Sequence, residues 1–187
     1  MSLAIRAPLA WLGPGRLAAA VQIDCEHGEI TAVGGAHPVP EGTQLLEASG
    51  FLMAAAADRH VHIGLADPMA VLLRGVTAVR DLAWPADRIF PLADASESPS
   101  FSGPLIRAAG PMLTGPGGYP TADRWAPAGT GRELRGPQDA EGAVGELGGR
   151  GAAAIKVSLN AEAGPTPDDG ELAAIAETAH RLGLPVT

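Results

Sequence analysis

FLMAAAADRHVHIG, residues 51–64, is a run of apolar and small residues that becomes polar only at its carboxyl end. Such a run is typical of a strand buried on both faces of a parallel sheet. Because side chains alternate along a strand, His60 and His62 are predicted to point to one side and Val61 to the other. Two imidazoles spaced in this way can bind one metal ion, although two histidines also alternate on half-buried strands that bind no metal.

The rest of the chain continues the pattern that this strand begins. Strand-like runs follow at VTAVRDL (76–82), PLIRAAG (104–110) and AAAIKVSL (152–159), and LPVT (184–187) is predicted to open a fifth strand. Helical stretches separate several of these runs, as expected for βα repeats. The predicted fold class is therefore α/β, with about half of an eight-stranded barrel, which typically needs about 250 residues.

Two helices have clear boundary signals. The first is predicted after Asp67, a capping residue followed by Pro68, and is expected to stop at Gly75. The second covers TPDDGELAAIAETAHRLG, with Thr166 as its N-cap and Pro167 at its first position. PQDAEGAVGELGGRG, which starts at residue 137, predicts a weak helix because Gly142, Gly145, Gly148 and Gly149 lie within it.

The segment before residue 51 has a different sequence pattern, of short alternating runs joined by turns. AAAVQID and EITAVGG alternate around an HG turn, which predicts a small β unit. The predicted domains are therefore a small β subdomain at 1–50, and four βα units with the start of strand five at 51–187. The long glycine- and proline-rich stretch at 110–136 is expected to be a functional loop.

Composition limits the partners and the compartment. The 187 residues include 13 basic and 21 acidic ones, for a net charge of -8, which argues against nucleic acid or an anionic membrane surface as partner. A small-molecule substrate fits better. Cys25 is the single cysteine, so no intrachain disulfide can form and the cytoplasm is the simplest compartment. We predict neither a signal peptide nor a membrane-spanning segment.

Lys156 is the second candidate for chemistry. It lies in an otherwise apolar predicted strand, where a charged ammonium group is costly unless it is paired or deprotonated. A neutral buried lysine can react with carbon dioxide to form an anionic carbamate whose oxygens can bridge two metal ions. The alternative is that the side chain extends along the strand end and keeps its amine in solvent.

Four motifs together resemble a known family. FLMAAAADRHVHIG, LLRGVTAVRDLA, IRAAGPMLTGPGGYP and GAAAIKVSL have the order and spacing of the amidohydrolase superfamily of metal-dependent hydrolases, and look most like its imidazolonepropionase-like and prolidase-like branch. VQIDCEHGEITAVGG resembles the strand-turn-strand that precedes the barrel in this family. The resemblance implies the amino-terminal half of a TIM barrel preceded by a small β-sandwich subdomain.

The resemblance also implies a mechanism and its residues. His60 and His62 would bind metal, and carboxylated Lys156 would be a catalytic residue that bridges two divalent ions, with zinc as the expected metal. The metals would activate water as hydroxide to hydrolyse an amide or cyclic amide C-N bond. Tyr119 stands where the family often has a histidine, so it is either a substrate-binding residue or an ordinary loop tyrosine.

Other features define the alternatives. Asp58 is expected to support the two histidines from the same strand face, and Arg80 and Asp81 are expected to form an ion pair. The family's ligands on strands five, six and eight have no counterpart in these residues. The chain is therefore either part of an enzyme, or a non-catalytic half-barrel that needs a carboxyl-terminal half or an oligomeric partner. A phosphate-binding barrel is disfavoured because no helix start follows GPGGYP.

Overall fold

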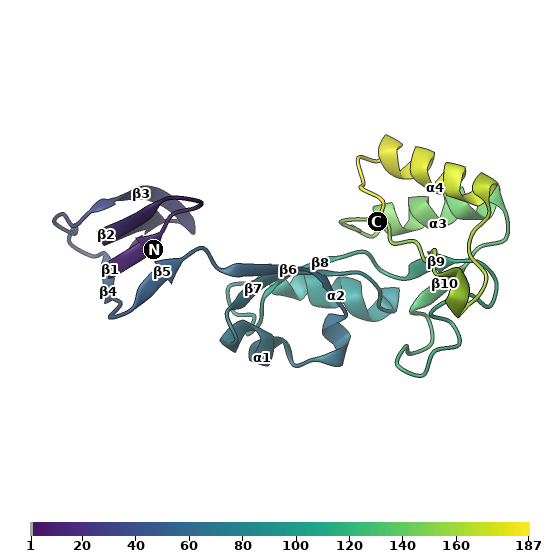
Figure 1. Ribbon diagram of the computed structural model, residues 1–187, viewed down its shortest axis with the longest axis horizontal. Helices are drawn as coiled ribbons and strands as arrows, with labels where there is room; N and C mark the ends of the chain where they lie inside the picture. The colour runs from purple at the N-terminus through teal and green to yellow at the C-terminus, as the bar shows by residue number, and fades with distance from the viewer. Residues whose placement is uncertain (1) are drawn as a thin grey trace. The chain divides into compact units, whose positions relative to one another are not determined.

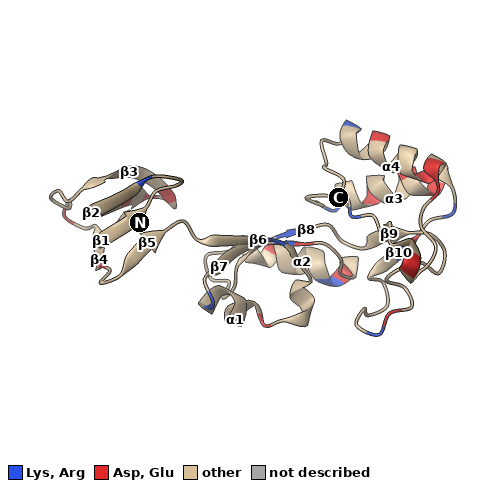
Figure 2. Cartoon of the chain, viewed as in Figure 1, with Lys and Arg blue, Asp and Glu red and all other residues tan. Residues whose placement is uncertain are grey.

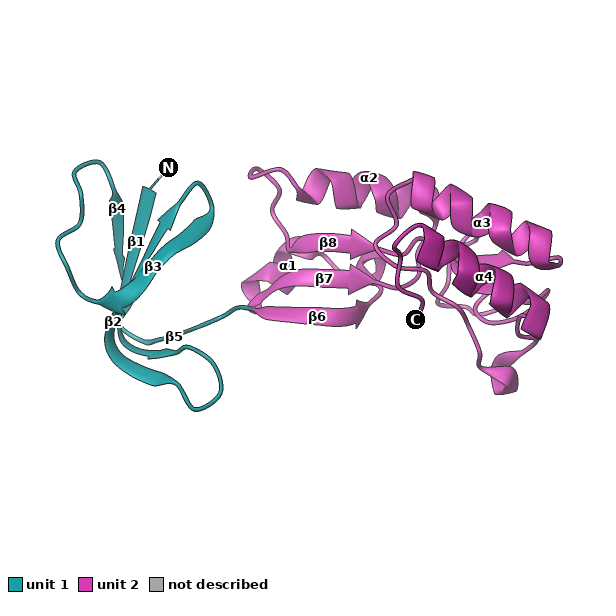
Figure 3. Ribbon diagram, turned by 90° about the horizontal axis from the view of Figure 1, so that it is seen from above, with its two compact units in different colours: residues 1–55 teal, residues 56–187 magenta. Residues whose placement is uncertain are grey.

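The computed structural model describes residues 2–187 (Figure 1). Their contacts divide the chain into two compact units, Met1–Ala55 and Ala56–Thr187 (Figure 3). The sequence places the boundary a few residues earlier, between residues 50 and 51.

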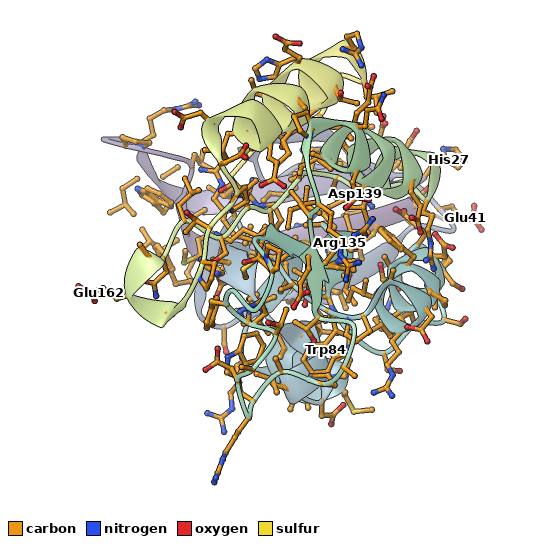
Figure 4. The ribbon with its side chains drawn as sticks, turned by 90° about the vertical axis from the view of Figure 1, so that its right-hand side faces the viewer. His27, Glu41, Trp84, Arg135, Asp139 and Glu162 are labelled. Carbon is orange, nitrogen blue, oxygen red and sulfur yellow. The ribbon has the colours of Figure 1, made fainter. Side chains whose placement is uncertain are left out.

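Unit 1 is one five-stranded sheet built around its first strand. Strand β1 pairs antiparallel with β2, which pairs antiparallel with β3. The other edge of β1 is shared, because β4 pairs parallel with its first half and β5 with its second half. His27 and Gly28 join β2 to β3 and both have positive φ, as in a tight hairpin turn, and His27 lies at the surface (Figure 4). The strands are β1 (Ser2–Trp11), β2 (Leu17–Glu26), β3 (Glu29–Gly35), β4 (Gln44–Glu47) and β5 (Phe51–Met53).

The predicted strand at 51–64 is two strands in the structure. Its first residues form β5 and belong to the sheet of unit 1, whereas β6 (Ala56–Val61) begins unit 2. The prediction that this run is buried on both faces is wrong, because five of the six β6 residues are exposed. The physical reason is that β6 is an edge strand, paired with β7 and with no other strand among the described residues.

Unit 2 contains the parallel sheet that the sequence predicts. Strands β6, β7 (Val76–Asp81) and β8 (Leu105–Ala108) lie side by side in that order (Figure 3). The predicted fourth strand continues the parallel arrangement through isolated bridges: Val157 pairs with Leu113, and Ile155 pairs with Val186 of the predicted fifth strand. The predicted functional loop also contains a short parallel pair, β9 (Met112–Thr114) and β10 (Gly131–Glu133).

Four α-helices complete unit 2. They are α1 (Pro68–Leu73), α2 (Ala86–Ser96), α3 (Pro137–Gly149) and α4 (Asp169–Arg181), and the turns η1 (Ile63–Leu65) and η2 (Ala161–Ala163) are 3-10 helices. Helix α1 starts as predicted, since the Asp67 carboxylate accepts from the Met69 amide at 3.1 Å. The predicted cap of α4 is wrong. Asp168, not Thr166, is the N-cap, because its carboxylate and that of Glu171 accept each other's backbone amides.

The core of unit 2 lies between the sheet and the helices. Ile106 of β8, Ile89 of α2, Val144 of α3 and Ile175 of α4 are all buried in it. Glu171 is 6% exposed and also accepts from the Gly136 amide at 2.7 Å, so one carboxylate binds the amino-terminal ends of both α3 and α4. The core and this carboxylate together hold the helices against the segment that carries Lys156.

Acidic residues outnumber basic ones in helices α3 and α4: each helix contains three Asp or Glu residues, and Arg181 is the single Lys or Arg in the two helices (Figure 2). Within residues 2–187, every helix is too short or too polar to cross a lipid bilayer.

Candidate metal and substrate site

The four side chains predicted from sequence line one cavity of about 170 Å³ in unit 2. His60 and His62 come from β6 and its end, Lys156 from the predicted fourth strand, and Tyr119 from the glycine-rich loop. Parallel strands place their carboxyl ends at one edge of a sheet, where ligands of α/β proteins usually bind. The complete lining is His60, His62, Met112, Tyr119, Lys156, Val157, Ser158, Leu159 and Asn160.

The ring of His62 is held on several sides. Its Nδ1 atom lies 3.1 Å from the carbonyl oxygen of Ala83, and because a carbonyl only accepts, Nδ1 carries the proton and Nε2 keeps a free lone pair. The ring packs on Trp125 with 4.6 Å between centroids, and meets His60 edge to face at 5.8 Å. A free Nε2 and a carbonyl-bound Nδ1 are the usual arrangement of a metal-binding histidine.

The electrostatics keep His62 neutral. Burial lowers the pKa of His62, the Ala83 carbonyl opposes this effect, and electrostatic interaction with His60 and Lys156 lowers the pKa further. Since the usual pKa is 6.5, His62 is unprotonated at neutral pH. A neutral imidazole is the form that binds a divalent metal.

Asp81 is a structural carboxylate beside the site. Its side chain is 0% exposed, and it accepts from the amides of Ile63 at 2.7 Å and Ala83 at 3.2 Å. Burial raises the pKa of Asp81 to about 6, although the two amides lower it. Ile63 follows His62 directly, and Ala83 provides the carbonyl that binds its ring. Asp81 therefore fixes the backbone on both sides of the His62 contact.

The expected ion pair of Arg80 and Asp81 is wrong. Alternation along β7 places the two side chains on opposite faces, so that Asp81 is buried while the Arg80 guanidinium donates to the carbonyl oxygen of Arg59 at 3.1 Å. Each side chain is thus satisfied by backbone groups instead of by the other.

The support role predicted for Asp58 rests on regular alternation, which the structure does not have. The pairing of β6 with β7 shifts register between Asp58 and Val61, so residues 58, 60 and 62 are not an uninterrupted face. The Asp58 carboxylate accepts from the backbone amide of His60 at 3.0 Å and lines a different cavity from the histidines. The Asp58 carboxylate therefore contacts the backbone of His60 and not its imidazole ring.

The glycines of GPGGYP serve close packing. A Cβ on Gly118 would lie 2.0 Å from the carbonyl oxygen of Pro165, and one on Gly115 would lie 2.8 Å from that of Thr166. The loop also binds β10, since the Gly117 amide donates to the Glu133 carboxylate at 2.9 Å. Close contact with the backbone of Pro165 and Thr166 therefore requires glycine at positions 115 and 118, and it holds the start of the loop that carries Tyr119.

Lys156 lies in a well-packed backbone segment. Its neighbours Ile155 and Val157 are buried, its carbonyl oxygen accepts from the Leu113 amide at 2.8 Å, and the residue itself is half-buried. Lys156 is also the single lysine of the chain, because the other 12 of the 13 basic residues are arginine. Arginine cannot be deprotonated in proteins, so the amine at this position is chemically distinct from every other basic side chain.

The donor set fits part of a metal site. Two imidazoles and an amine share the cavity, and no group of three or more His, Cys, Asp or Glu side chains able to hold a metal ion occurs within residues 2–187. The residues present therefore suit a metal only with further ligands. The sequence prediction omits Trp125, Ser158 and Asn160, and also the backbone carbonyl of Ala83, for which no sequence pattern is a signal.

No protein-family model matches the chain, and no curated protein sequence does. Solved structures do match. A prolidase complexed with N-methylphosphonate-L-proline has a TM-score of 0.80 at 22% identity over 100% of this chain and 55% of its own. Molinate hydrolase has 0.79 at 18% over 99% and 52%, and ochratoxinase from A. niger has 0.77 at 21% over 96% and 53%.

These matches define the class of fold. The chain has the mixed α/β fold of the amino-terminal part of amidohydrolase-type hydrolases, which confirms at the level of the fold the resemblance found in the sequence. It spans about half the length of the solved structures that it matches.

Proposed function

We propose that this chain is the amino-terminal part of a metal-dependent hydrolase that cleaves an amide or cyclic amide C-N bond. The observation that carries the proposal is that His60, His62 and Lys156 line one cavity at the carboxyl edge of a parallel sheet. The matched fold supports it, since its members include a prolidase, an amidohydrolase and a molinate hydrolase. The proposed substrate is a small molecule.

Each residue has a proposed task. The imidazoles of His60 and His62 would hold divalent metal, most simply zinc, and a carbamate on Lys156 would replace the ammonium with an anionic group whose two oxygens could bind metal. Bound there, metal would supply Lewis-acid activation of water and of the scissile carbonyl. The hydroxyl of Tyr119 would donate a hydrogen bond to the substrate, and the Ala83 carbonyl keeps the proton of His62 on Nδ1.

The complete molecule requires a second half. We propose that unit 2 is the first half of a TIM barrel and that unit 1 is one layer of a β-sandwich, with the remainder supplied by carboxyl-terminal sequence or a partner chain. The uncovered edge of β6 and the exposed apolar side chains of unit 1, which include Leu17 and Ile30, support this proposal. A reducing cytoplasm is the expected compartment.

The alternative is that these residues alone are not catalytic. The described residues contain no group of three or more His, Cys, Asp or Glu side chains placed to hold a metal ion, and this observation favours an inactive half that works only when joined to the other. Assay of the 187 residues with and without the carboxyl-terminal half separates the two readings, because turnover without that half contradicts the alternative.

Metal analysis tests the proposal directly. We expect about two divalent ions per active site in the complete protein after dialysis, and His60→Ala and His62→Ala are each expected to lower both metal content and hydrolysis at least about 100-fold. His27→Ala is the matched control, because His27 lies in an exposed turn of unit 1. A folded complete protein without metal, or either site variant with normal turnover, would contradict the proposal.

Because Lys156 is the single lysine of these 187 residues, its proposed carbamate can be tested by ¹³C labelling. With ¹³C-labelled carbon dioxide, we expect a side-chain carbamate resonance in the complete protein that is absent from Lys156→Arg, which keeps the positive charge. Lys156→Ala is expected to be inactive and to regain activity with added short carboxylic acids. Normal activity of Lys156→Ala without such acids would exclude the bridging role.

A further inference from the structure

We propose that Trp125 is a positioning residue for His62, and that it connects the glycine-rich loop to the metal ligand. The inference rests on the proposed function, because it assumes that His62 binds metal. Trp125 does not line the cavity, so its action is on the ligand and not on the substrate.

The contact between the two rings carries the inference. Trp125 packs on His62 with 4.6 Å between centroids and 36° between planes, within the range of offset aromatic pairs. The Ala83 carbonyl binds one edge of the same imidazole through Nδ1. A hydrogen bond at one ring atom still permits rotation about its axis, whereas a second contact on the ring face opposes that rotation. The two contacts together set the plane of the imidazole.

The loop holds Trp125 as part of a compact segment. Successive turns join the Thr121 amide to the Gly118 carbonyl at 2.9 Å, the Asp123 amide to the Pro120 carbonyl at 3.0 Å and the Ala126 amide to the Asp123 carbonyl at 3.2 Å. The Trp125 ring lies 6.0 Å from that of Tyr119, which lines the cavity. The indole of Trp125 is therefore paired with two rings of cavity-lining residues, Tyr119 and His62.

Trp84 illustrates a purely structural role in the same unit. It is 8% exposed, and a Cβ on Gly64 would lie 2.0 Å from its ring. Trp125 is only partly buried at the edge of the core and packs on a polar ring, so loss of its side chain should affect His62 more than the free energy of unfolding.

Nuclear magnetic resonance of the metal-free complete protein tests the contact. The ring protons of His62, assigned with His62→Ala, should be shifted upfield by the indole, and ¹⁵N shifts should show the Nδ1-H tautomer. Trp125→Phe should keep both signatures, and Trp125→Leu should lose the upfield shift and show mixed tautomers. Ring-proton shifts of His62 that are the same in wild type and Trp125→Leu would overturn the inference.

Titration with Co²⁺ tests the consequence for metal binding. Trp125→Leu should bind Co²⁺ about 10-fold more weakly than wild type, and Trp125→Phe should stay within about 3-fold. Trp11→Leu, in unit 1, is the control and should bind as wild type does. Unchanged Co²⁺ affinity of Trp125→Leu overturns the positioning role and leaves the proposed function intact. Wild type that binds no Co²⁺ overturns the proposed function, and the positioning role with it.

Discussion

Asp81 shows how one buried carboxylate organises the site without touching its ligands. It accepts from the amides of Ile63 and Ala83, and these residues are the chain neighbour and the hydrogen-bond partner of His62. Removal of this acceptor would leave two buried amides unsatisfied, at a cost of about 1–3 kcal/mol each. The geometry of His62 thus depends on a residue that makes no contact with the cavity.

The raised pKa of Asp81 predicts a pH dependence of stability. The unfolded value is about 3.9 and the folded value about 6, so the folded state binds the proton more tightly. The free energy of unfolding should therefore fall by about 2–3 kcal/mol as the pH rises from about 4 to just above 6. Chemical denaturation at several pH values should show this fall in wild type and not in Asp81→Asn.

Asp139 provides a control of opposite sign. The hydrogen bond from Arg132 lowers the pKa of this partly exposed carboxylate, and Asp139 also accepts from the Arg135 amide (Figure 4). Its contribution is present above the unfolded pKa and is lost as the pH falls below it. Asp139→Asn should therefore leave the fall between pH 4 and 6 unchanged. A wild-type stability that is flat across this window would contradict the role of Asp81.

At the scale of single residues, sequence patterns can identify side chains whose own functional groups are expected to bind metal. Spacing identifies His60 and His62, and an apolar surrounding identifies Lys156, and the structure brings all three to one cavity. The partner of Asp81 could not be predicted, because an aspartate beside an arginine suggests an ion pair, whereas its acceptor role depends on tertiary contacts with backbone amides.

Helix α3 shows the balance between propensity and packing at the scale of an element. Glycine costs up to about 1 kcal/mol relative to alanine in a helix interior, yet this helix contains several. A Cβ on Gly145 would meet nothing within 4 Å, whereas one on Gly148 would lie 2.9 Å from Leu182 Cδ1. Packing against the end of α4 therefore accounts for Gly148 but not for Gly145.

Gly145→Ala should raise the free energy of unfolding by about 0.5–1 kcal/mol, since it lowers the entropy of the unfolded chain without a clash. Gly148→Ala is the matched comparison and should gain less or nothing, because Leu182 has to move. Denaturant titrations of both variants, with unchanged slope, measure the difference. A loss of stability in Gly145→Ala would show that this face of α3 is packed in solution.

Element types were easier to predict than their ends. The strands that become β7 and β8, and the helices α1, α3 and α4, follow from apolar spacing and caps. Helix α2 was not predicted, and Pro91 lies inside it, where a proline argues against a helix. The start of α4 was wrong because two capping residues lie two positions apart, and Glu171 selects Asp168 over Thr166.

Sequence patterns predicted the arrangement of the whole molecule less well than they predicted single residues or elements. Counting βα units predicts half of an α/β barrel, and the matched solved structures show a mixed α/β fold that this chain shares over about half of their length. The run at 51–64 was predicted as a buried strand, but burial depends on what lies beside it. Within residues 2–187 nothing pairs with the outer edge of β6.

The exposed apolar surface of unit 1 allows a final prediction. Ile30 is 65% exposed and lines an apolar cavity of about 300 Å³ together with Ile23, Val33 and Met53. Apolar side chains gathered in this way are typical of a surface that another segment covers. If unit 1 is one layer of a sandwich, Ile30→Lys should prevent the 187 residues from co-purifying with a separately expressed carboxyl-terminal half.

Leu73→Lys is the control for that experiment, because Leu73 is 77% exposed at the end of α1 and lies outside this cavity. A charge there should leave co-purification unchanged, since the side chain is already in solvent. Binding of a hydrophobic dye should fall when the two halves combine, and should stay high for Ile30→Lys. Because burial of apolar area drives such association, normal co-purification of Ile30→Lys would mean that this face of unit 1 is not the covered surface.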